Sequence, residues 1–210
     1  LGGKEFALHI KGQEIPMHEP RFKMGMGMGY AVSTTGADHC HNIHDNLFMS
    51  GGPGLEEIRE IIGYIEPLEL HDLGPDKMRV LYHWICFNFL RNSLCFCNFV
   101  PLSPSQLVKL VEASTGWRTS LFDLLKVGER GLALARLFNM REGVKPEEDE
   151  LPEFFFKNAL KSEPLKGTKI NKEEFLKARD IFYEIAGWEG DKVRRGKLLE
   201  LGIEEFGEGI

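Results

Sequence analysis

A long apolar segment, residues 78–94, constrains the fold of this chain more than any other feature. Pro75 precedes it at a position suited to the first turn of a helix, and the segment is apolar on nearly every side. A helix of this kind is buried, so we expect it at the centre of the protein. It ends in Asn-Ser-Leu-Cys-Phe-Cys-Asn-Phe, residues 92–99, shortly before Pro101.

Shorter helical patterns surround this segment. We expect helices at 55–62, 103–114, 120–140, 154–160 and 171–186, with short helices closing the chain. Ser103 with Gln106, and Asn171 with Glu174, predict helix starts. Residues 6–16 predict two short extended segments around a glycine turn, and the acidic run 147–150 predicts a solvated connector. The fold class expected is all-α: one multihelical domain, 1–210, with a small N-terminal extended segment.

The charge balance narrows the choice of partners. The chain carries 26 Lys and Arg against 32 Asp and Glu, which argues against a nucleic-acid or anionic-membrane surface. We find neither a secretory signal nor an apolar run of membrane-spanning length, so we expect a cytoplasmic protein. The four cysteines do not form a disulfide framework, because Cys95 and Cys97 are too close to pair easily.

Residues 24–30 alternate methionine and glycine before Tyr30, which superficially resembles a nucleotide-binding loop. The Rossmann fingerprint needs a preceding buried strand and G-x-G-x-x-G spacing, and both are missing here. We expect these glycines to let the backbone approach another group closely or to let a helix pack tightly.

Two groups of residues could bind metal. His39, Cys40, His41 and His44 are suitable ligands for Zn or Ni, but their spacing matches no standard zinc pattern, and a polar loop is the alternative. Cys95 and Cys97 could supply half of the four ligands that an iron–sulfur cluster needs, or could be inert buried thiols. Cys86 lies too far back along the central helix to join them.

Several segments together identify a family. They are residues 9–16 followed by Glu19-Pro-Arg21, Gly27-Met-Gly-Tyr-Ala31, Gly36-Ala-Asp-His39, Val127-Gly-Glu-Arg130, Arg136-Leu-Phe-Asn139, Gly187-Trp188 and Leu201-Gly-Ile203. In this order and spacing the chain resembles the C-terminal domain of the tungsten-containing aldehyde:ferredoxin oxidoreductases along nearly its whole length.

The resemblance implies roles for particular residues. The family's loop after the central helix reads Asp-x-x-Gly-Leu-Cys, and it holds a tungstopterin and one ligand of a [4Fe–4S] cluster. Cys97 stands at the position of the cluster ligand, and Cys95 at that of the glycine. His39 corresponds to a histidine near the tungsten, used for substrate positioning or proton transfer. The cofactor-binding set is Thr35, His41, Asn92, Phe96, Cys97 and Asn98.

The resemblance also implies partners. The other three cluster ligands come from a Cys-x-x-Cys-x-x-x-Cys motif, and this sequence lacks that motif, the first pterin loop, the N-terminal sheet domain and the Cys-rich middle domain. The chain opens with Leu-Gly-Gly, and we expect a piece of something longer. Ferredoxin would accept the electrons, and the isolated chain would be inactive.

Three hypotheses for the function follow. The first is the C-terminal part, or a separate subunit, of an aldehyde-oxidising tungstopterin enzyme. The second is a non-catalytic relic or interaction module with the same fold. It is motivated by four departures from the family pattern, at Thr35, His41, Asn92 and Cys95. The third is a small metal-binding protein that uses the cluster between His39 and His44.

Overall fold

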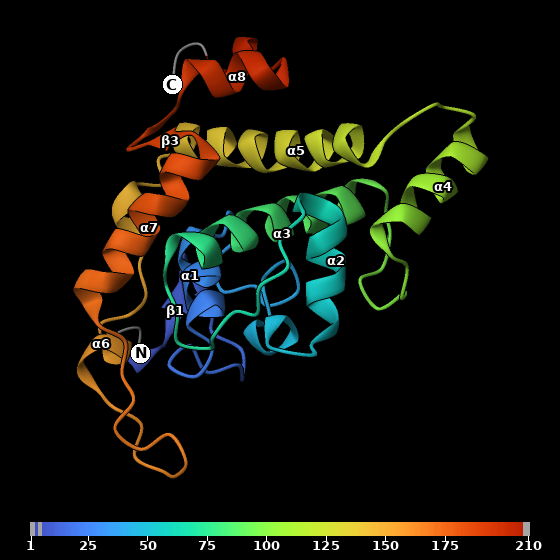
Figure 1. Cartoon of the computed structure of the whole chain (residues 1–210). Helices are drawn as coiled ribbons and strands as arrows, with labels where there is room; N and C mark the ends of the chain where they lie inside the picture. Colours follow the sequence, from blue (N-terminus) through green and yellow to red (C-terminus); the bar gives the residue numbers. More distant parts are fainter. Residues whose placement is uncertain (1–2, 4–5, 208–210) are drawn as a thin grey trace.

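The computed structural model describes residue 3 and residues 6–207, and its centre is one long helix, α3, Pro75–Ser93. This helix covers the apolar segment and buries residues on most of its sides. In Figure 1, α5 (Leu121–Arg141) lies along α3, α7 (Lys172–Ala186) lies at one end, and α1 (Met24–Val32) lies below. The predicted central helix and the all-α fold class are therefore confirmed.

The remaining elements are short. They are the helices α2 (Pro53–Ile62), α4 (Pro104–Thr115), α6 (Phe154–Lys157) and α8 (Arg195–Leu201), with 3-10 turns at Asp45–Phe48, Pro146–Glu148 and Glu204–Gly207. The predicted N-terminal piece is a hairpin of β1 (His9–Ile10) and β2 (Gln13–Glu14). A second hairpin, β3 (Trp188–Glu189) with β4 (Lys192–Val193), was not predicted.

Local capping explains why most helix boundaries were predictable. Ser103 and Gln106 form the expected capping box, and Gly116 ends α4 in the left-handed conformation. The Asn171 side chain accepts hydrogen bonds from two backbone N–H groups of α7, and Gly187 ends that helix. The prediction for α6 was too long, because this helix ends at Lys157 and not near residue 160.

The two central helices approach each other closely at Gly128. A Cβ atom there would lie 1.9 Å from the carbonyl oxygen of Cys86 on α3, so no larger residue fits without moving a backbone. Gly131 faces the Phe89 ring, where a Cβ atom would make a tight contact of 3.2 Å with the side chain and none with the backbone of α3. The buried thiol of Cys86 sits in this interface, where it is a packing residue.

Segments distant in the sequence are tied together by side-chain hydrogen bonds from α5. The Arg130 side chain donates to the backbone oxygen of Leu201, 2.9 Å away. Asn139 donates to the backbone oxygen of Thr34 at 2.7 Å. The bond from Asn139 fixes the histidine-bearing loop that follows α1.

The glycine-rich segment is helix α1, so the expectation of close packing is confirmed. Its N-terminus is capped by the Asp45 carboxylate, which accepts hydrogen bonds from the N–H groups of Gly25 and Met26 at 3.0 and 2.9 Å. A Cβ atom on Gly29 would lie 1.7 Å from the side-chain oxygen of Asn42. The small residues of α1 therefore let the histidine-bearing loop pack directly on the helix.

The acidic run 147–150 was predicted to be solvated, and this is wrong for Asp149. Its carboxylate is fully buried, 2.6 Å from Lys11 Nζ and 2.5 Å from Arg136 Nη1, and it also accepts a hydrogen bond from the Tyr183 hydroxyl. The partners come from β1–β2, α5 and α7, which sequence spacing does not bring together. Among residues 3 and 6–207, no helix has both the length and the apolarity needed to cross a membrane.

Candidate functional site

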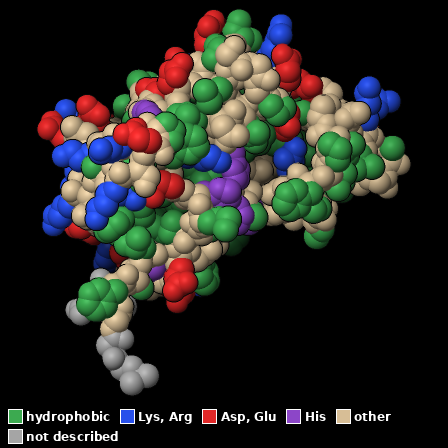
Figure 2. Space-filling model, turned by 90° about the horizontal axis from the view of Figure 1, so that it is seen from below, with side chains coloured by type: hydrophobic (Ala, Val, Ile, Leu, Met, Phe, Trp, Pro, Cys, Tyr) green, Lys and Arg blue, Asp and Glu red, His purple; other side chains and the backbone are tan. Residues whose placement is uncertain are grey.

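The candidate site lies where two loops meet, one after α1 (residues 33–44) and one after α3 (residues 94–99). Seen from below, histidine side chains gather near the middle of this face, beside a hollow (Figure 2). Asn98 joins the two loops, because its side-chain amide donates to the backbone oxygen of Cys40 at 3.0 Å. The site is therefore built from segments almost sixty residues apart.

The end of α3 explains the unusual position of Cys95. The N–H of Cys95 bonds to the oxygen of Asn92, and the N–H of Phe96 bonds to that of Arg91. These two bonds form a Schellman motif, whose left-handed residue is usually glycine. Cys95 occupies that position with φ 54°. The glycine expected from the resemblance is thus a backbone requirement that a cysteine meets at some cost.

The motif fixes the direction of the chain into the next residues. Phe96 is half-buried and packs against the core, while the thiols of Cys95 and Cys97 are both exposed. The alternative in which both are inert buried thiols is therefore wrong for this pair and holds only for Cys86. Cys97 is a free thiol on a loop anchored on both sides.

A cavity of about 180 Å³ gathers three of the predicted cofactor-binding residues: Thr35, His41 and Asn92 all line it. Its floor is apolar, with side chains of α3 and α5, and its rim is polar. Phe96, Cys97 and Asn98 are not in its lining and lie on the adjoining loop. The predicted cofactor-binding residues thus form two neighbouring groups, one in the cavity lining and one on the adjoining loop.

His41 is paired with a residue that sequence reasoning did not place in the site. Its Nδ1 atom contacts the Asp38 carboxylate, and this hydrogen bond raises the pKa of His41 while lowering that of Asp38. Asn92 lines the same cavity and contributes, less than Asp38, to the raised pKa of His41. The contact therefore favours the protonated form of His41 and the ionised form of Asp38 at the rim of the cavity.

His39 lies among other imidazoles. Its ring centroid is 4.9 Å from that of His18 and 6.2 Å from that of His44, and its Nε2 atom is 3.6 Å from the Cys40 sulfur. Burial, together with Lys23 Nζ at 3.3 Å, lowers the pKa of His44 to about 4. His44 is therefore a neutral imidazole at neutral pH, and it points towards Lys23 rather than towards a shared centre.

Sequence reasoning missed His18, Asp38 and Lys23. His18 directly precedes the Glu-Pro-Arg segment, which was the one available signal that this region mattered. Asp38 belongs to the polar run before the histidines, but its pairing with His41 depends on the turn at residues 38–41.

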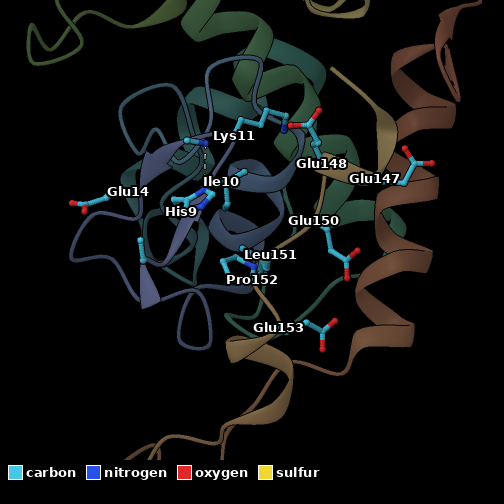
Figure 3. Close-up of a pocket in the computed structure, with 12 residues that line it drawn as sticks. His9, Ile10, Lys11, Glu14, Glu147, Glu148, Glu150, Leu151, Pro152 and Glu153 are labelled. Carbon is cyan, nitrogen blue, oxygen red and sulfur yellow. Dashed lines mark hydrogen bonds between the residues drawn. The ribbon is translucent and has the colours of Figure 1, made fainter. Parts of the chain in front are cut away.

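A larger cavity lies elsewhere. It measures about 800 Å³ and lies between the β1–β2 hairpin and the connector 147–153. Figure 3 shows that acidic side chains of the connector line one side and Lys11 lies across from them. None of the predicted site residues lines it, and Lys11 pairs with the buried Asp149. We interpret it as a surface recess beside a structural ion pair.

Known proteins resemble this chain along nearly its whole length. Residues 1–203 match the family model described as aldehyde ferredoxin oxidoreductase, domains 2 and 3. The tungsten-containing aldehyde ferredoxin oxidoreductase of Pyrococcus horikoshii is 31% identical over 210 residues, and that of Thermococcus kodakarensis is 32% identical over 209 residues. Each alignment covers 98% of this chain and 32% of the relative, so the chain spans about a third of their length.

A solved structure has the same fold. The active site complex BamBC of benzoyl coenzyme A reductase, in complex with 1,5-dienoyl-CoA, superposes with a TM-score of 0.63 at 16% identity. The match covers 97% of this chain and 34% of that one. At this identity the likeness establishes the fold alone.

Proposed function

This chain belongs to the aldehyde ferredoxin oxidoreductase family, and on that premise we propose that it is the C-terminal helical part, or a separate subunit, of a tungstopterin enzyme. The complete enzyme would oxidise an aldehyde to the carboxylic acid and pass the electrons to ferredoxin. The observation that carries the proposal is Cys97, an exposed thiol on a loop fixed against the histidine-bearing loop.

Cys97 is proposed as one ligand of a [4Fe–4S] cluster. Such a cluster takes four ligands, and Cys97 offers one accessible sulfur from a loop held by the Schellman motif and by Asn98. The residues present therefore suit a shared cluster, with three cysteines from a Cys-x-x-Cys-x-x-x-Cys motif in another domain or chain. Cys95 is not proposed as a ligand, because its role at the helix end is conformational.

The cavity and the adjoining loop are proposed as one wall of the pterin site. At about 180 Å³ the cavity is too small to enclose a bis-pterin group, and its polar rim over an apolar floor suits one edge of it. On this loop the side-chain oxygen of Asn98 is buried and accepts no hydrogen bond from the described residues, so a ligand amine would have to displace part of the loop to satisfy it. Thr35, His41, Asn92 and Phe96 complete the proposed wall.

When bound, the tungstopterin supplies the two-electron redox chemistry and the cluster carries the electrons away. This chain's own contribution would be His39. Its half-buried imidazole can donate a hydrogen bond to a carbonyl oxygen or accept a proton from a reacting group. The Asp38–His41 pair places a hydrogen-bonded imidazole at the cavity rim, where its second ring nitrogen could bond to a polar group of the cofactor.

The remaining expectations belong to the same proposal. Residues 1–210 would form a single domain that needs a partner carrying the first pterin loop, and the assembled protein would work in the cytoplasm with ferredoxin. Neither nucleic acid nor membrane is proposed as a partner, given the acidic charge balance.

Isolation of the protein from its native source, with any chain or domain that accompanies it, tests the proposal. We expect tungsten and iron to co-purify with the protein in a fixed ratio, measured by inductively coupled plasma mass spectrometry. A protein without tungsten and iron would favour the second candidate, a non-catalytic module with this fold. The observation that favours this alternative is Cys95, whose side chain stands at a position where the family has glycine.

A further inference from the structure

The cluster around His39 includes two residues that the proposed function does not use, His18 and Cys40, next to two that it does, Asp38 and His39. Asp38, His39 and Cys40 each offer one ligand atom, and these atoms all lie within 4.8 Å of one another. His18 adds a fourth group from a segment twenty residues earlier, with its ring centroid 4.9 Å from that of His39. We propose that His18, Asp38, His39 and Cys40 form a binding site for a soft divalent metal ion, Zn²⁺ above all.

The spacing of the first two ligands suits a tetrahedral ion. Typical Zn–N and Zn–S bonds, at a tetrahedral angle, place the nitrogen and the sulfur roughly 3.6 Å apart. In the structure His39 Nε2 and Cys40 Sγ are 3.6 Å apart. Both atoms can therefore bind one ion without rearrangement of the backbone.

The position of His18 follows the same geometry. Two imidazoles bound to one tetrahedral ion have ring centroids roughly 5 Å apart, if each is bound through a nitrogen at the usual distance. The His18 and His39 rings meet this condition, although the His18 nitrogens do not yet converge with the ligand atoms of Asp38, His39 and Cys40, so His18 would have to turn towards the ion. Asp38 already accepts a hydrogen bond from the N–H of Cys40 at 2.7 Å, so its carboxylate is held next to the site.

The other two histidines of the sequence cluster lie next to the site but are not among the residues whose ligand atoms converge. His41 contacts Asp38 and lines the cavity, and the His44 ring, 5.0 Å from that of His18, has its Nδ1 atom 3.3 Å from Lys23 Nζ. The site therefore differs from the sequence hypothesis, which grouped His39, Cys40, His41 and His44 in a spacing that matches no standard zinc pattern. Thiolate and imidazole donors together favour Zn²⁺ over harder cations.

The site is accessible to an ion from solvent. Cys40 is exposed, and His18, Asp38 and His39 are half-buried. Burial and the nearby Asp38 raise the pKa of the Cys40 thiol, so an ion must displace its proton on binding. In an assembled enzyme a bound ion would remove His39 from its proposed role, so we expect Zn²⁺ to inhibit.

Zinc binding to the full chain, under reducing conditions, tests the inference. We expect one Zn²⁺ per chain by competition with a chromophoric chelator, and a thiolate-to-cobalt charge-transfer band when Co²⁺ replaces it. Cys40→Ser should weaken binding at least about 100-fold and abolish the band, and His18→Gln should weaken it at least about tenfold.

Matched controls keep the test decisive. Cys95→Ser and His71→Gln remove an exposed thiol and an exposed imidazole outside the site, and neither should change the affinity. Circular dichroism melts verify that every variant is folded. The inference is overturned if the chain binds no Zn²⁺, if Cys40→Ser binds like the wild type, or if binding is lost in Cys97→Ser instead. The Zn²⁺ titration does not measure tungsten or iron, so the inference can fail while the proposed function holds, and the reverse.

Discussion

Two polar clusters in this molecule differ in whether their groups pair with one another inside the chain. The closed cluster, Lys11, Arg136, Asp149 and Tyr183, is buried, and both of its cations pair with the single Asp149 carboxylate. The open cluster, His18, His39, Cys40 and Cys97, presents half-buried imidazoles and exposed cysteines without a common partner in the part of the chain that the structure describes. Buried ion pairs within the chain indicate a structural role, whereas accessible ligand atoms indicate a binding role.

The two clusters should also differ in how much the fold is destabilised when one of their side chains is removed. Removing one charge from a closed cluster leaves the others buried and unpaired, which is strongly destabilising. Removing a side chain from an open cluster leaves no buried charge without its partner. Stability and ligand binding should therefore respond to different substitutions.

The largest expected effect comes from Asp149→Asn, which keeps the size of the side chain and removes its charge. Lys11 and Arg136 would lose their buried counter-ion, so we expect the free energy of unfolding to fall by about 3–5 kcal/mol. Urea titration followed by circular dichroism measures the change. His39→Gln, in the open cluster, should change it by less than about 0.5 kcal/mol. If the two variants lost similar amounts of unfolding free energy, the distinction between the clusters would be contradicted.

A second closed cluster, around Glu129, should give a smaller change in the free energy of unfolding, and this change should depend on pH. Burial alone would raise the pKa of Glu129, but hydrogen bonds from Lys126, Lys197 and Tyr82 outweigh it and lower the pKa to about 2. The unfolded chain titrates near 4.5, so this carboxylate stabilises the fold fully above that pH and loses its contribution as the pH falls towards 2.

We therefore expect Glu129→Gln to lower the free energy of unfolding at pH 7 by on the order of 2 kcal/mol. The difference from the wild type should shrink steadily between about pH 4.5 and pH 2, measured by chemical denaturation at each pH. A difference that stays constant across this range would show that Glu129 is not held in its ionised form by these partners.

The smallest expected effect concerns the loop of the open site. Cys95→Gly relieves the left-handed strain at φ 54° and adds backbone freedom to the unfolded chain, so we expect a net stabilisation of about 0.5 kcal/mol. Cys97→Gly lacks the first contribution and should destabilise by about 0.5 kcal/mol. Thermal melts of the two variants measure the difference, and equal shifts in both would contradict the conformational role of Cys95.

The local parts of this fold could be predicted from the sequence, and the long-range parts could not. Helix α3 follows from an apolar run, and α4 from a capping box, both of which lie within a few neighbouring residues. Asp149 was predicted to be solvated because its acidic neighbours are, yet its partners Lys11 and Arg136 come from other elements.

In the candidate site, too, local features could be predicted from the sequence and contacts between distant segments could not. Cys97 and His39 were identified through the resemblance, and the loops that carry them do meet through Asn98. His18 was missed, because nothing in its neighbourhood along the chain indicates that it packs against His39. The role of Cys95 was recognised as a glycine position, but the reason, a left-handed helix end, needed the backbone.

The central claim is that Cys97 completes an iron–sulfur cluster shared with another domain or chain. Electron paramagnetic resonance of the reduced native assembly, compared between Cys97→Ser and Cys95→Ser, tests it most directly. We predict that Cys95→Ser keeps the iron content and the reduced-cluster signal of the wild type, while Cys97→Ser loses that signal or iron. A Cys97→Ser protein with wild-type iron and an unchanged signal would contradict the claim.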